Sequence, residues 1–118
     1  MADIIPYKTI RMSPMEQYDA AMTLRHNGNE TEAENALVSL AADVPDFALT
    51  YSALAAIYKR AGKLEQAVSN MQKYCQLESE DPFGYSVLSA FCIAAGKHAE
   101  AEDALAKASE LRFRSQFG

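Results

Sequence analysis

Apolar residues recur along the chain at helical spacing, three and four positions apart. In the segment 48–60 they are Tyr51, Leu54, Ala55 and Tyr58, which lie on one face of an α-helix. Segments 33–40, 67–74 and 101–108 repeat the stripe, and so do segments 14–26 and 82–94. Nothing in this pattern requires a strand. The pattern therefore predicts an all-α protein.

Three Gly-x-x-x-x-Ala motifs divide the chain at a period of 34 residues, at 28–33, 62–67 and 96–101. A glycine just past a helix adopts the left-handed conformation at little steric cost, so each motif marks the end of one helix and the start of the next. Two helices per period of about 34 residues are typical of a solenoid, in which each repeat buries its apolar face on its neighbours. Ser13 and Glu16 predict a capping box at the start of the first repeat.

These positions resemble the tetratricopeptide repeat (TPR) family. Counted from Pro14, Ala48 and Pro82, the family pattern has an aromatic residue at positions 4 and 11, Leu at 7, a small residue at 8, Gly at 15 and Ala at 20. The second repeat matches best, with Tyr51, Leu54, Ala55, Tyr58, Gly62 and Ala67. Gln17 departs from the pattern at position 4, and Leu40 and Tyr74 stand where the family has a small residue at position 27.

The resemblance implies a right-handed superhelical solenoid of three helix-turn-helix TPR repeats. The repeats would span 14–47, 48–81 and 82–113, after an N-terminal arm at 1–13 and before a C-terminal tail at 114–118.

The resemblance also implies where a partner binds. In this family the first helices line a concave groove that accepts an extended peptide or a partner helix. The matching positions 2, 5, 9, 12 and 13 are Met15, Tyr18, Met22, Arg25 and His26; Leu49, Ser52, Ala56, Lys59 and Arg60; and Phe83, Ser86, Ala90, Ile93 and Ala94. Methionine and aromatic side chains suit apolar anchors, and the four cationic positions form a basic corner that suits a carboxylate. Alternatively, Arg25, Lys59 and Arg60 only complement the helix C-termini.

Composition narrows the function further. The 118 residues fit one domain, and the net charge of −5 with a pI near 4.9 argues against a nucleic-acid surface. No apolar run is long enough to span a bilayer, and no signal peptide is recognisable, so we expect no membrane insertion and a cytoplasmic location. Cys75 and Cys92 fall at different phases of the repeat, which predicts two buried free thiols.

Enzymatic activity is not expected. His26 and His98 belong to different repeats, and Gly62-Lys63 lacks the remainder of a phosphate loop. Acidic residues at the starts of the second helices complement helix dipoles better than they form a metal site. We therefore predict no catalytic residue, cofactor or metal. One TPR subclass clamps a chaperone's C-terminal carboxylate, but its positions here are Tyr18, Met22, Ala53, Phe83 and Val87, so that clamp is absent.

The last repeat has no capping helix after it in this sequence. Leu105, Ala108, Leu111 and Phe113 are therefore expected to form an open edge, covered by self-association or by a partner. An arm carrying Ile4, Ile5, Tyr7 and Ile10 could cover an edge too, or lie loosely on the first repeat.

The sequence thus predicts a non-enzymatic protein-interaction scaffold that docks a peptide or helix of a protein partner in its concave groove. A cytoplasmic chaperone for a secretion or assembly subunit is an alternative, and so is a structural subunit that assembles into a homo-oligomer through its uncapped C-terminal repeat.

Overall fold

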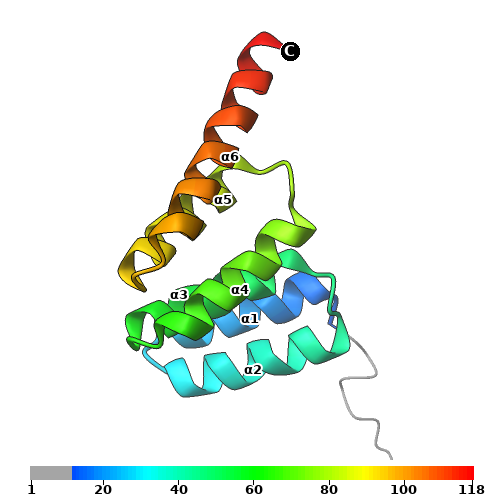
Figure 1. The fold of residues 1–118 in the computed structure, drawn as a ribbon. Coiled ribbons are helices and arrows are strands. Elements are labelled where there is room, and N and C mark those ends of the chain that lie inside the picture. Colours follow the sequence, from blue (N-terminus) through cyan, green and yellow to red (C-terminus); the bar gives the residue numbers. More distant parts are fainter. Residues whose placement is uncertain (1–11) are drawn as a thin grey trace, which may run out of the picture.

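The fold consists of six helices joined by short turns (Figure 1). A computed structural model describes residues 12–118, so Ile4, Ile5, Tyr7 and Ile10 of the expected arm lie outside the described residues. The helices are α1 (Pro14–His26), α2 (Glu30–Asp43), α3 (Ala48–Arg60), α4 (Leu64–Leu77), α5 (Pro82–Ala94) and α6 (His98–Phe117). Residues 12–118 contain no strand, and the all-α prediction is confirmed.

The helix ends follow the predicted register. The Ser13 side chain accepts a hydrogen bond from the Glu16 backbone N–H, and the Glu16 carboxylate accepts one from the Ser13 N–H, which completes the capping box. Gly28, Gly62 and Gly96 have φ values of +86°, +77° and +77°. Because a side chain is strained in that left-handed region, glycine lets the chain turn sharply into the second helix of each repeat.

Each first helix packs on its own second helix, and each second helix packs on the first helix of the next repeat. In Figure 1, α2 and α4 lie in front of α1 and α3, and the α5–α6 pair stands at an angle to them. The chain is elongated, 57 × 35 × 22 Å. Its core has two clusters, one between the first two repeats around Leu37 and Leu54 and one between the last two around Met71 and Leu88.

Two apolar residues of the predicted stripes, Ala20 and Leu105, are exposed. Ala20 on α1 is exposed, because no described helix packs on that side of the first repeat. Leu105 on α6 is 52% exposed, whereas Leu37 and Met71 at the same position of the earlier repeats are 0% and 2% exposed. A following repeat covers Leu37 and Met71, whereas residues 12–118 include no repeat after the one that carries Leu105. Burial in a solenoid thus depends on a neighbour as well as on the repeat's own pattern.

A tyrosine occupies the small-residue position 27 of the second repeat, and a glycine in α5 makes room for it. A Cβ placed on Gly84 would lie 2.7 Å from Cε1 of Tyr74. The Tyr74 hydroxyl donates to Oδ2 of Asp81 at 2.6 Å, and Oδ1 of the same carboxylate accepts from the Phe83 N–H at the start of α5. Burial, with the Asp81 hydrogen bond and charge, raises the pKa of Tyr74. Tyr74 therefore joins α4 to the cap of α5.

Candidate functional site

The five predicted groove positions lie on the face of the first helices opposite the core stripe, because their helical angles together span less than about a third of a turn. Met15, Phe83 and Ile93 are exposed on this face, with 45%, 69% and 57% of their surface accessible. Tyr18, Met22, Leu49, Ser52, Ala56 and Ser86 are half-buried, and Ala90 and Ala94 are exposed. We call these residues, together with Arg25, His26, Lys59 and Arg60, the groove face.

Two apolar members of the groove face also support the fold. Tyr18 and Met22 pack against the core cluster of the first two repeats. The Tyr18 ring meets the Phe47 ring edge-on, with centroids 6.2 Å apart, and burial raises the pKa of its hydroxyl. Phe47 directly precedes α3, so this contact fixes how the second repeat starts against the first. Replacing Tyr18 would consequently change the fold as well as the surface.

The four residues of the predicted basic corner have different surroundings. Arg60 forms an ion pair with Glu30 at the start of α2, with Nη1 and Oε2 3.5 Å apart. The Lys59 ammonium lies 5.8 Å from the centre of the Phe91 ring on α5. The two side chains therefore reach toward different repeats. Arg25 is half-buried and His26 exposed at the end of α1.

One cation beside the groove face was not predicted from the sequence. α6 continues to Phe117, six residues beyond the point that matches the end of α4, so residues 114–117 of the expected tail are helical. Arg112 on this extension donates a hydrogen bond from its guanidinium to the Ser86 hydroxyl on α5. The repeat pattern contains no signal for it, because position 31 normally falls in a turn.

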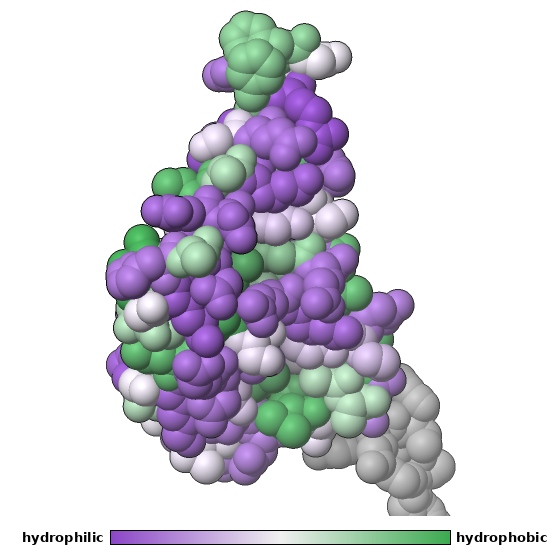
Figure 2. Space-filling view, in the orientation of Figure 1, coloured by the Kyte–Doolittle hydropathy of each residue, from purple (hydrophilic) through white to green (hydrophobic). Residues whose placement is uncertain are grey.

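The open C-terminal side of the third repeat is smaller than expected. Leu105 and Phe113 are exposed, but the prediction was wrong for Ala108 and Leu111, which are buried because α6 packs on α5 along their length. A hollow of about 180 Å³ lies there, lined in part by Ile93, Ala101 and Leu105. We call Ile93, Leu105 and the hollow the end face. Phe113 and Phe117 lie farther along, with ring centroids 4.7 Å apart, where Figure 2 shows hydrophobic atoms at the free end of α6.

The described residues show no cluster that would hold a metal ion. Within 12–118 no group of three His, Cys, Asp or Glu side chains is placed to hold a metal ion. Cys75 and Cys92 are free and buried, as predicted. Burial raises the pKa of the Cys75 thiol to about 11 and also raises that of Cys92, which keeps both as neutral thiols at neutral pH.

The fold and its surfaces define an all-helical repeat solenoid whose six helices fit a TPR-like repeat. A scan against protein-family models gives no match, and a search among curated proteins gives none. Among helices of residues 12–118, none has both the length and the apolar character needed to cross a bilayer.

Solved structures share the fold. MamA from Desulfovibrio magneticus RS-1 (41 to the end) is 26% identical with a TM-score of 0.76, over 88% of this chain and 58% of that one. The CopN-Scc3 complex gives a TM-score of 0.78 at 18% identity, over 92% and 66%. The Yersinia enterocolitica type III secretion translocator chaperone SycD gives 0.73 at 18%, over 93% and 80%. The chain thus spans less than two thirds of the length of MamA. These neighbours are helical-repeat proteins, and one is a chaperone by its name.

Proposed function

We propose that the protein is a non-enzymatic interaction module that docks a peptide or helix of a protein partner on its groove face. The observation that carries this proposal is the exposure of Met15 and Phe83 on the first helices. A folded chain gains nothing from leaving these large apolar side chains in water, whereas a partner's apolar anchors would bury them. Arg25 at the end of α1 supplies positive charge for an acidic group of that partner, and His26 beside it supplies a hydrogen-bonding side chain.

A matched pair of phenylalanines tests the groove face. Phe83 and Phe117 are 69% and 72% exposed, but only Phe83 belongs to the groove face. Phe83→Ala should lower the affinity for the physiological partner about tenfold, the equivalent of about 1.4 kcal/mol, while Phe117→Ala leaves it unchanged. Quantitative recovery of partners on immobilised protein, followed by calorimetry with the one recovered, measures both. Equal recovery by the wild type and Phe83→Ala would contradict the proposal.

Self-association through the end face is a second candidate, favoured by the exposure of Ile93 and Leu105 at the place where a further repeat would pack. Light scattering should then give a mass above the 12.9 kDa of one chain, and Leu105→Glu should return it to one chain. Val38→Glu is the matched control, because Val38 is 48% exposed on α2. A single-chain mass at the highest soluble concentration would exclude this candidate.

A chaperone role for a secretion or assembly subunit would use the same groove face, and likeness to SycD in fold is its support. We also propose that the protein is located in the cytoplasm.

A further inference from the structure

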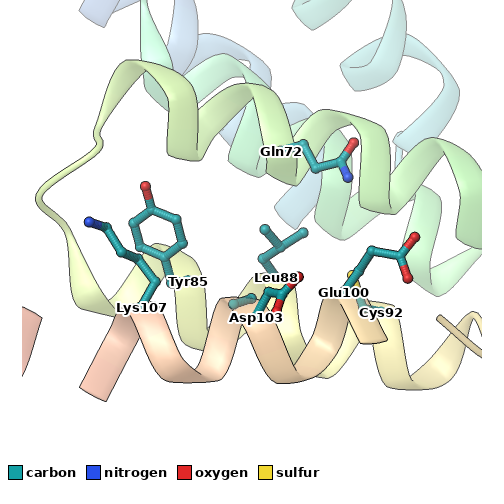
Figure 3. Close-up of a pocket in the computed structure, with 8 residues that line it drawn as sticks. Gln72, Tyr85, Leu88, Cys92, Glu100, Asp103 and Lys107 are labelled. Carbon is teal, nitrogen blue, oxygen red and sulfur yellow. The ribbon is translucent and has the colours of Figure 1, made fainter. Parts of the chain in front are cut away.

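A hollow of about 220 Å³ opens between the second and third repeats, on the side formed by the second helices and away from the groove face. Figure 3 shows Gln72 on α4 facing Leu88, which rises from α5 together with Tyr85. Cys92 contributes to the floor from α5, and Glu100 and Asp103 stand at the rim on α6. Apolar groups thus form the bottom of the hollow and carboxylates form one edge.

The hollow has a cause in the sequence. At position 11 the second repeat carries Tyr58, whose ring packs against the first core cluster and whose hydroxyl donates to Glu34. The third repeat has Cys92 at that position. A thiol occupies much less space than a phenol, so the junction between the second and third repeats lacks a ring that the junction before it has. The missing ring leaves a hollow above Leu88 and Cys92, whose own side chains stay buried, with 9% and 1% of their surface accessible.

The rim carries two carboxylates, Glu100 and Asp103, that form no ion pair with another described residue. Lys107 at the other edge, in contrast, pairs with Glu110 at 3.8 Å. The second repeat has Gln66 and Ser69 at the positions of these two carboxylates. The acidic rim and the hollow therefore both distinguish the third repeat from the second.

Size restricts what the hollow can hold. An engineered apolar cavity of about 150 Å³ holds benzene, and sites for drug-sized ligands are about 300–1,000 Å³. At about 220 Å³ this hollow suits one aromatic ring. A second hollow of about 440 Å³ adjoins it, sharing Gln72, Tyr85 and Leu88 and continuing along α4 to Gln76 and Ser79. The chain that carries the ring could follow this path.

We propose that this hollow is a second docking site, which takes one aromatic side chain of a protein partner whose neighbouring residues are lysine or arginine. The aromatic ring covers Leu88 and Cys92 in the place that Tyr58 fills one repeat earlier. The adjacent cations meet Glu100 and Asp103. The Gln72 amide and the Tyr85 hydroxyl, whose hydrogen bond to the Cys75 carbonyl is 3.5 Å long, are available to the partner's backbone.

Three capped tripeptides test the site directly, by titration into labelled protein followed by the backbone amide signals. Lysine-phenylalanine-lysine should shift the signals of Gln72, Leu88 and Ala104. Lysine-alanine-lysine lacks the ring, and glutamate-phenylalanine-glutamate reverses the charge. We expect both to bind at least about threefold more weakly, as for loss of an apolar anchor or of surface ion pairs.

Two variants of the protein complete the test. Cys92→Phe restores a ring at position 11 and should abolish the shifts by filling the hollow. Glu100→Gln/Asp103→Asn changes only exposed positions, so it keeps the fold, and should weaken binding of lysine-phenylalanine-lysine about threefold or more. Glu102→Gln, on the same helix but at the end face, is the control and should bind as the wild type does.

The proposal is overturned if lysine-phenylalanine-lysine shifts no signal around the hollow, or if all three peptides bind equally. Shifts centred on Met15 and Phe83 would also overturn it, and would favour the groove face. Unchanged binding by Glu100→Gln/Asp103→Asn would overturn the role of the rim even if Cys92→Phe did not fold.

Discussion

Leu37→Ala is expected to lower the free energy of unfolding by about 2–5 kcal/mol, the range for truncating a buried leucine. Leu37 is fully buried in the cluster that joins the first two repeats, where Ala21, Leu54 and Ile57 surround it. The substitution removes apolar area from this junction and leaves a cavity that the flanking helices only partly close. Urea unfolding followed by circular dichroism at dilute protein measures the change.

Leu105→Ala is the matched control for this prediction. Leu105 has the same residue type and repeat position, but it is 52% exposed because no third junction covers it. Its replacement should change the free energy of unfolding by less than about 1 kcal/mol. Equal costs for the two variants at dilute protein would contradict the claim that burial at this position comes from the following repeat. A cost for Leu105→Ala that appears only at high concentration would instead support self-association through the end face.

The register of the three glycines was enough to predict the helix order and the turns, because a left-handed turn and a capping box are local features of the chain. The cap predicted at Ser13 is present, and the first helices begin at the residues from which the repeats were counted, Pro14, Ala48 and Pro82. The prediction that both cysteines are buried free thiols is also confirmed. These successes depend on spacing and on residue type alone.

The errors arise where burial depends on distant parts of the chain. Ala20 matches the apolar stripe but is exposed, because no described helix packs on that side of the first repeat. Ala108 and Leu111 were assigned to the open edge because the pattern does not show how far α6 continues along α5. The groove face stays a prediction. In the chain without a partner, a binding surface and an ordinary solvent-exposed surface have the same exposed side chains.

Departures from the family pattern at the repeat junctions were harder still to interpret from one repeat alone. Cys92 in place of an aromatic residue opens the hollow between the last two repeats, and the hollow becomes apparent only beside Tyr58 of the preceding repeat. Tyr74 was a departure from the pattern whose compensation lies ten residues away, at Gly84. Complementary pairs of this kind show why a repeat consensus predicts the backbone better than it predicts the surface.

Gly84→Ala is the second substitution with a large expected effect, and its sign is opposite to that of helix propensity. Alanine normally stabilises a helix interior by about 0.5–1 kcal/mol relative to glycine. Here the new Cβ would lie 2.7 Å from Cε1 and 3.0 Å from Cδ1 of Tyr74. Because the Tyr74 hydroxyl is held by Asp81, the ring cannot move away without loosening the cap of α5. We expect the free energy of unfolding to fall by about 1–3 kcal/mol, as for an overpacked core.

A double-mutant cycle with Tyr74→Leu separates this clash from other effects. Leucine lacks the ring atoms nearest Gly84, so adding Gly84→Ala to Tyr74→Leu should cost little or should stabilise the protein by its helix propensity. The two substitutions should therefore be non-additive by about 1–3 kcal/mol, which lies within the range of about 0.5–3 kcal/mol for residues in contact. Additive costs would show that Gly84 is needed for a reason other than the Tyr74 ring, and stabilisation by Gly84→Ala alone would show that the α4–α5 junction yields more easily than the Asp81 hydrogen bonds imply.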